Sequence, residues 1–184
     1  KITAAFNNDK ASKVFNHIVV QQMTDDVRQH VTEGNFCSWL MDGSAAAKRK
    51  LTYEAELIYI RTANSLIPAI ELFSFVSMQP YGTVNAENLY HALLKTLVLM
   101  GDKSDTEILK PVDEVSIAEL EKKLKSSNIH KKVIGAGADG ASVNFGVKKG
   151  LVTRYNSISE WLVKVHCFSH RLELKGLEQE GTKD

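Results

Sequence analysis

Apolar residues recur along the chain with two periods, one typical of helices and one typical of strands. Between residues 9 and 32 they return every three or four positions, which predicts an amphipathic helix with one buried face. The segments 36–41, 51–62 and 66–78 are apolar runs rich in β-branched and aromatic residues, which predicts three strands. Because turn residues separate these runs, consecutive strands are expected to pair as an antiparallel meander.

The second half of the chain predicts further helices and shorter strands. Residues 85–100 carry an apolar stripe at helical spacing, and residues 116–125 form a short charged helix that begins at an N-capping serine. The segments 131–135 and 161–167 are expected to be strands. The whole order predicts an α/β fold, in which helices flank a meander extended by further strands.

Composition places the chain among globular domains. Its 184 residues are 43% hydrophobic and 24% charged, which suits one compact domain with a core. A formal net charge of +1 excludes nucleic-acid binding through an overall positive charge, so any such binding depends on local basic patches. Two cysteines, Cys37 and Cys167, form no disulfide framework and suit a reducing compartment. No apolar run approaches the ~20 residues that span a bilayer, so no membrane partner is expected.

Two aspartates are the candidate catalytic residues. Asp42 and Asp139 each come just past a predicted strand, and each is followed by glycine. Carboxylates held together at strand ends can bind Mg²⁺ or Mn²⁺, and two such ions support phosphoryl transfer. Under the alternative interpretation, both are turn residues that accept hydrogen bonds from their own loops.

The segment 135–140 (GAGADG) also matches the glycine-rich pattern of dinucleotide-binding loops. Glu160 lies at about the distance of the acid that binds the ribose, but it precedes a predicted strand instead of ending one. Asp139 inside the loop would also repel a pyrophosphate. A nucleotide-binding module would require a doubly wound parallel sheet, so the pairing of the first three strands separates this alternative from the others.

A second cluster of candidate ligands follows the last predicted strand. Cys167 and His170 are residue types that bind zinc, yet a structural zinc site needs four ligands and no second pair is visible. The alternative is a buried thiol and a hydrogen-bonded histidine at a strand-to-helix turn. Trp39 and Trp161 lie in predicted strands and are expected in the core.

Basic residues follow both aspartates. They are Lys48, Arg49 and Lys50 after Asp42, and Lys148, Lys149 and Arg154 after Asp139. If the two loops meet at one sheet edge, these charges would line a track for a phosphate backbone. The alternative is a solvated charged surface.

Three segments, taken in order, resemble the motifs of hAT-family (hobo–Activator) transposases and of host proteins derived from them. Residues 36–44 (FCSWLMDGS) look like the first catalytic strand, and residues 137–144 (GADGASVN) are similar to the second acidic motif. Residues 165–174 (VHCFSHRLEL) look like the Cys-x-x-His motif. The resemblance implies a ribonuclease-H-like fold, catalytic and metal-binding roles for Asp42 and Asp139, and a nuclear location. DNA and protein partners or self-association are implied as well.

Departures from the family pattern favour a silent descendant. Residues 45–47 are alanines where the family carries Thr or Asp, and the family's third acid, a glutamate, would lie downstream of this chain. We expect a helix over 1–34, an incomplete ribonuclease-H-like domain over 35–175 and a tail over 176–184, together a fragment of a longer protein. The role expected is a DNA-associated or protein-interaction scaffold; the alternative is half of an active two-metal DNA-cleaving core.

Overall fold

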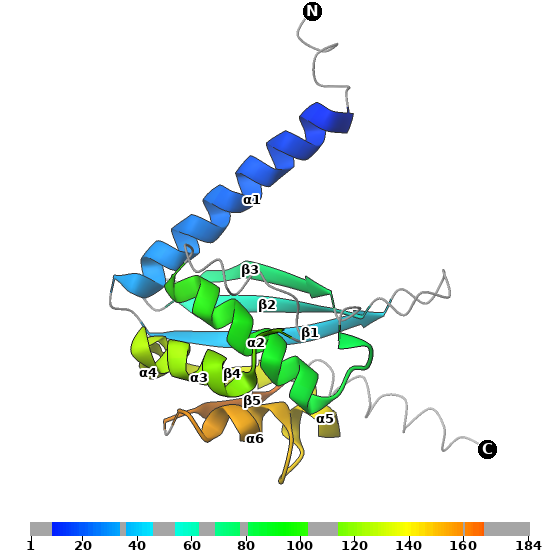
Figure 1. The fold of residues 1–184 in the computed structure, drawn as a ribbon, viewed down its shortest axis with the longest axis vertical. Helices are drawn as coiled ribbons and strands as arrows, with labels where there is room; N and C mark the ends of the chain where they lie inside the picture. Colours follow the sequence, from blue (N-terminus) through cyan, green and yellow to red (C-terminus); the bar gives the residue numbers. More distant parts are fainter. Residues whose placement is uncertain are drawn as a thin grey trace, which may run out of the picture.

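One mixed sheet with helices packed against it forms the body of the molecule (Figure 1). The computed structural model describes residues 9–33, 36–45, 54–62, 69–77, 81–102, 114–159 and 161–167. The combination of helices with one sheet confirms the α/β class predicted from the sequence.

The sheet has the strand order β3-β2-β1-β4-β5. Its strands are β1 (Cys37–Ala45), β2 (Glu54–Thr62), β3 (Ala69–Ser77), β4 (Val133–Ala138) and β5 (Val163–His166). Strand β1 pairs antiparallel with β2, and β2 pairs antiparallel with β3. On its other side β1 pairs parallel with β4, and β4 pairs parallel with β5. The parallel pairing directs the C-terminal ends of β1, β4 and β5 to one edge of the sheet.

Six helices lie in the described part of the chain. They are α1 (Asp9–Thr32), α2 (Ala86–Gly101), α3 (Ile117–Ser126), α4 (Ile129–Lys132), α5 (Ser142–Phe145) and α6 (Leu151–Asn156). The side chain of Asn85 caps α2 by accepting hydrogen bonds from two backbone amides of its first turn, and Ser116 caps α3 by accepting from one. The caps fix the predicted starts of both helices. The helices α4 and α6 were not predicted.

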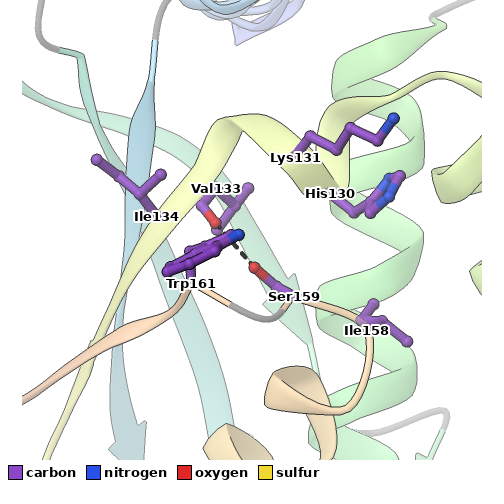
Figure 2. Close-up of a pocket in the computed structure, with 7 residues that line it drawn as sticks. All are labelled: His130, Lys131, Val133, Ile134, Ile158, Ser159 and Trp161. Atoms are coloured by element: carbon purple, nitrogen blue, oxygen red, sulfur yellow. Dashed lines mark hydrogen bonds between the residues drawn. The ribbon is translucent and has the colours of Figure 1, made fainter.

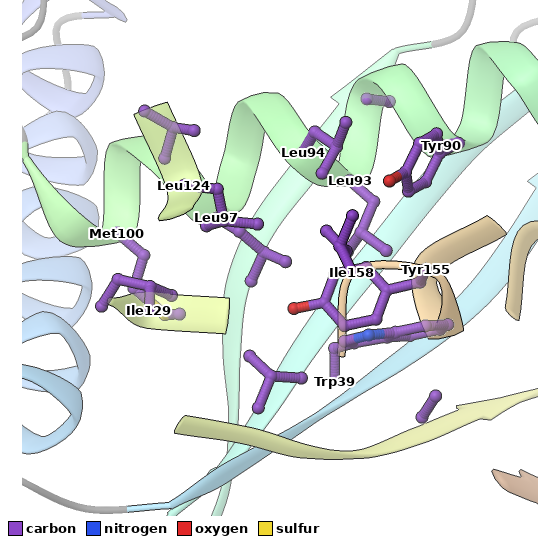
Figure 3. Close-up of a cluster of buried hydrophobic side chains, with 14 of the residues drawn as sticks. Trp39, Tyr90, Leu93, Leu94, Leu97, Met100, Leu124, Ile129, Tyr155 and Ile158 are labelled. Carbon is purple, nitrogen blue, oxygen red and sulfur yellow. The ribbon is translucent and has the colours of Figure 1, made fainter. Parts of the chain in front are cut away.

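The core lies between α2 and the sheet and extends to α3, α4 and α6 (Figure 3). Leu93, Leu97 and Met100 of α2 are fully buried. Trp39 of β1 is also fully buried, and its ring meets Tyr155 of α6 edge to face, with 5.9 Å between centroids. Aromatic pairs of this geometry add to the stabilisation from burial. The prediction that Trp39 is a core residue is therefore confirmed.

Trp161 was also predicted to lie in the core, and this prediction is wrong because its side chain is 83% exposed. Strand β5 begins at Val163, so Trp161 lies in the turn before it. The apolar anchors of this segment are Ile158 and Leu162, which are both buried. These two side chains pack into the core on either side of Trp161, and the indole remains exposed.

Helix α1 buries its apolar face only near its C-terminal end. Val27 and Val31 are buried, whereas the earlier apolar side chains Val14, Phe15, Ile18 and Met23 are more than half exposed. The prediction of one buried face along the whole helix is therefore wrong for its first half, which extends beyond the sheet (Figure 1). No described helix is long and apolar enough to cross a membrane.

Candidate functional site at the C-terminal ends of β1 and β4

Asp42 occupies a strand position. It was expected just past the end of the first strand, but it lies within β1 and pairs with Leu57 of β2. Antiparallel pairing with β2 continues as far as Ala45 and Glu54. Strand β1 therefore includes Gly43, the glycine that had suggested a turn. The side chain of Asp42 lies outside the described residues.

The register of the parallel pair brings the two aspartates to neighbouring positions. Leu40 of β1 pairs with Gly137 of β4. Asp42 lies two residues beyond Leu40, and Asp139 lies two residues beyond Gly137. The two aspartates therefore stand at the same level on adjacent segments, at the C-terminal edge of the sheet.

The carboxylate of Asp139 is bonded to its own loop. Its Oδ1 accepts a hydrogen bond from the backbone N–H of Ala141, at 3.1 Å, and another from Asn144 Nδ2, at 2.6 Å. Asn144 is buried in α5, and its own Oδ1 is buried without a hydrogen-bond partner in the described structure. The interpretation of Asp139 as a turn aspartate is thus confirmed. Asn144, which orients it, is the last residue of the segment 137–144 that resembles the second acidic motif, but no separate role was predicted for it.

The glycine-rich segment does not form a phosphate-binding loop. Gly135 and Gly137 lie within β4, where they pair with Ser38 and Leu40 of β1. A Cβ at position 137 would overlap the Leu40 side chain, and one at position 135 would overlap Ser38. Both glycines are therefore explained by the close packing of β1 side chains over the β4 backbone. The antiparallel pairing of β1 with β2 also differs from the sheet that a dinucleotide-binding module would require.

The Cys-x-x-His cluster begins at the adjacent strand end. The backbone N–H of Cys167 donates to Ala138 O at 2.8 Å, which extends the pairing of β4 and β5, and the Cys167 side chain is exposed. The expected burial of this thiol is therefore wrong. The ring of His166 stacks on Phe145, with centroids 3.7 Å apart, and His170 lies outside the described residues. Among the residues that the structure describes, no three acidic, histidine or cysteine side chains are grouped as metal ligands would be.

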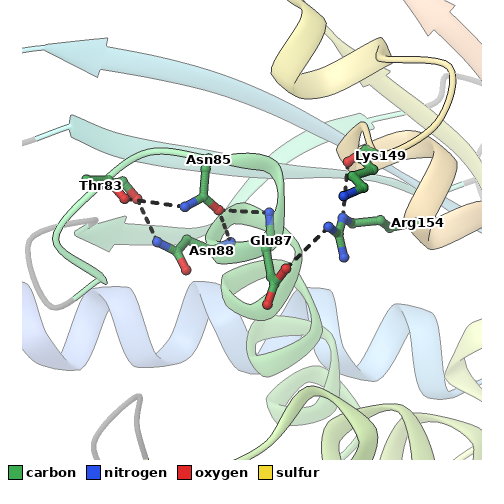
Figure 4. A network of polar contacts seen from close by, with 6 residues as sticks. All are labelled: Thr83, Asn85, Glu87, Asn88, Lys149 and Arg154. Carbon is green, nitrogen blue, oxygen red and sulfur yellow. Dashed lines mark hydrogen bonds and ion pairs between the residues drawn. The ribbon is translucent and has the colours of Figure 1, made fainter.

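The basic residues after Asp139 have two different surroundings (Figure 4). Arg154 is held in place, since Nη2 contacts Glu87 Oε2 at 3.3 Å and Nε donates to Lys149 O at 3.1 Å. Lys148 and Lys149 are exposed on the loop between α5 and α6, and they line an open groove against Asn85 at the start of α2. Lys48, Arg49 and Lys50 lie outside the described residues.

Burial makes the remaining reactive side chains structural. Cys37 is buried in β1, and this burial raises the pKa of its thiol to about 12, so the thiol is protonated and a poor nucleophile at neutral pH. His91 is buried in α2. Its Nε2–H donates to Val115 O at 2.6 Å, so Nδ1 is left to accept from the Tyr81 hydroxyl at 3.3 Å. Burial raises the pKa of Tyr81 to about 12.

Comparison with known proteins gives no relative, because no family model, no curated protein and no solved structure matches the chain.

Proposed function

We propose that the chain is a ribonuclease-H-like core derived from an hAT-family transposase, and that it acts as a catalytically silent, DNA-associated or protein-interaction scaffold in the nucleus. Two features of the sheet support this proposal. Three antiparallel strands in sequence order are extended on the β1 side by two parallel strands, β4 and β5. The three motif-like segments begin at β1, near the end of β4 and at the end of β5, which are consecutive along this part of the sheet.

The observation that carries the proposal is that Asp42 and Asp139 lie at matching backbone positions on neighbouring segments of the sheet. Two carboxylates on adjacent strands are the arrangement from which a two-metal phosphoryl-transfer site is built. The pairing of Leu40 with Gly137 puts the backbones of Asp42 and Asp139 at matching positions, which supports such an arrangement.

The hydrogen bonds that Asp139 already makes support the proposal that the site is catalytically inactive. Its Oδ1 already accepts two hydrogen bonds, from Ala141 N and from Asn144 Nδ2. A divalent cation binds through the lone pairs of carboxylate oxygens, so these donors compete with it. The sequence also has alanines at 45–47, soon after Asp42, where the family carries Thr or Asp. The second candidate, an active two-metal core, rests on the shared level of the two aspartates alone.

Calorimetric titration with Mn²⁺ separates the two candidates. We would compare the wild-type chain with Asp42→Asn, with Asp139→Asn and with a control, Asp26→Asn, which removes an exposed carboxylate of α1. The silent scaffold predicts the same weak, unsaturable heat in all four proteins and no Mn²⁺-dependent cleavage of DNA. Saturable binding that is lost in both site variants and kept in the control would establish the active alternative.

The DNA-associated role has its own test. Lys148 and Lys149 are exposed in a groove that Ser142 and Val143 of the segment after Asp139 also line. Removing charges that contact phosphates weakens binding and reduces its salt dependence. We expect fluorescence anisotropy with a duplex oligonucleotide to show weaker binding for Lys148→Gln/Lys149→Gln than for the control Lys122→Gln/Lys125→Gln on α3. Equal loss in both double variants, or no binding by the wild type, would contradict DNA association through this edge.

A further inference from the structure

A second pocket lies at the opposite end of β4 from the two aspartates. His130 and Lys131 of α4, Val133 and Ile134 of β4, and Trp161 line this pocket, which has a volume of about 440 Å³ (Figure 2). This volume lies within the ~300–1,000 Å³ range of ligand pockets. None of the described residues that line it is acidic.

The indole of Trp161 is an exposed aromatic surface at this pocket. It is 83% exposed, while Ile158 and Leu162 on either side of it are buried in the core. The hydroxyl of Ser159 donates to Val133 O at 3.1 Å and so ties the same turn to the start of β4 (Figure 2). The described residues on both sides of the ring are therefore anchored to the core or to β4. A large exposed aromatic ring next to such anchors is suited to stacking with a planar ligand.

The charges of the pocket select among planar ligands. Lys131 is exposed at its rim, and His130 is half-buried with its Nδ1–H donated to Leu124 O at 3.3 Å. Ile134, which is 37% exposed, adds apolar surface. An aromatic ring linked to an anion satisfies the indole and the ammonium together, which is the chemistry of a nucleotide unit.

We propose that this pocket binds single-stranded nucleic acid, with one base stacked on Trp161 and an adjacent phosphate paired with Lys131. The inference deepens the DNA-associated role and rests on that part of the proposed function. It assigns a single-stranded segment to this end of β4, whereas the duplex would contact the lysines at the other end. Stacking on aromatic side chains tolerates any base, so the pocket would bind with little sequence preference.

The two tryptophans make the proposal directly measurable. Trp39 is fully buried and Trp161 is exposed, so a ligand at the pocket quenches the fluorescence of Trp161 alone. The probe is an oligothymidylate of about twelve nucleotides, within the ~4–16-nucleotide sites of single-strand binders. We expect saturable quenching by the probe and protection of the same fluorescence from iodide.

Variants then locate the binding. Anisotropy with the labelled probe should show a loss of affinity of about tenfold or more for Trp161→Ala, since stacking on an aromatic ring is lost. Trp161→Phe should retain part of the affinity, and Lys131→Gln should lower both affinity and salt dependence. The matched control is Lys125→Gln on α3. Because Trp161 is exposed, thermal unfolding of Trp161→Ala should match the wild type, which separates loss of binding from loss of fold.

Other outcomes overturn the proposal. Equal affinity of Trp161→Ala and wild type, or equal losses for Lys131→Gln and Lys125→Gln, would show that no pocket of this kind is used. Quenching by poly-glutamate but not by the oligonucleotide would assign the pocket to an acidic protein segment. Duplex binding that depends on Lys148 and Lys149, without binding of the oligothymidylate, would leave the proposed function in place and reject this inference alone.

Discussion

The side chain of Leu40 packs directly over the backbone of Gly137, where β1 pairs with β4. The two residues are paired in the parallel register, and any Cβ at position 137 would overlap Leu40 Cδ2. Both aspartates of the candidate site lie two residues beyond this contact. Room for the Leu40 side chain at this pairing therefore depends on glycine at position 137, next to the strand ends that carry both aspartates.

Substitution of Gly137 by alanine should destabilise the fold. The added methyl has no room under Leu40, and overpacking of this kind costs about 1–3 kcal/mol in unfolding free energy. Urea denaturation measures the loss. Gly140→Ala is the matched control, because a Cβ there meets only His166 Nδ1 at an ordinary 3.5 Å. Adding Leu40→Ala should recover part of the loss, and strictly additive effects of the two substitutions would contradict the contact.

Removal of the Tyr155 hydroxyl should leave the protein as stable or make it more stable. This hydroxyl is buried and has no hydrogen-bond partner in the described structure, and burying an unsatisfied polar group costs about 1–3 kcal/mol. Tyr155→Phe keeps the edge-to-face contact with Trp39, whereas Tyr155→Ala should lose about 3–5 kcal/mol. Thermal and urea unfolding compare the two variants. A clear destabilisation by Tyr155→Phe would reveal a bond that the hydroxyl makes.

Stability should fall at alkaline pH, partly through Cys37. Burial raises the pKa of this thiol from 9.0 to about 12 in the folded chain. The unfolded thiol therefore ionises first, so the stability from the neutral buried thiol is complete below pH 9 and is lost as pH rises toward 12. The unfolding free energy, measured by urea denaturation across this window, should fall less steeply with pH for Cys37→Ala than for the wild type. The two slopes should differ by up to about 1.4 kcal/mol per pH unit. Parallel curves for the two proteins would exclude a contribution from this thiol.

The two cysteines should differ in reactivity. Cys167 is exposed and Cys37 is buried, so a thiol reagent should label one cysteine in the folded protein and both in denaturant. Mass spectrometry after labelling identifies the site, and Cys167→Ser should remove the rapid reaction. Rapid labelling of Cys37 in the native protein would indicate that β1 opens locally.

The Asn85 cap should contribute measurably to the stability of the core helix. Its Oδ1 accepts from the backbone amides of Glu87 and Asn88, at 3.0 and 2.9 Å. Loss of both bonds in Asn85→Ala should cost about 1 kcal/mol of unfolding free energy, while Asn85→Asp should retain the cap. Denaturant unfolding of the three proteins provides the comparison. Equal losses for alanine and aspartate would point to the neighbouring bond from Asn85 Nδ2 to Thr83 instead.

Sequence pattern was sufficient where local chemistry decides the structure. The starts of α2 and α3 follow from Asn85 and Ser116, because a capping side chain acts within one turn of its own position. The pattern was insufficient where pairing with a strand distant in sequence determines the structure. The glycine after Asp42 predicted a turn, but nine consecutive pairings with β2 continue β1 through it.

Trp161 and α6 show a second limit. A hydrophobic run does not show which of its apolar residues will be buried. In this segment Ile158 and Leu162 are buried in the core, whereas the larger indole of Trp161 is exposed. Helix α6 is only six residues long, too short for a helical period to stand out. The level of Asp42 with Asp139 depends on the register of two strands far apart in sequence, which no local pattern specifies.

The end of α1 depends on a residue far along the chain. The ammonium of Lys132 donates to Val31 O at 2.7 Å and to Thr32 O at 2.9 Å, and so satisfies carbonyls that the helix leaves open. Contacts between such distant residues form only after a long loop has closed, and they slow folding. The last turn of α1 should therefore become ordered late, after β4 has docked beside β1. In pulse-labelling hydrogen exchange, its amides should gain protection after those of α2.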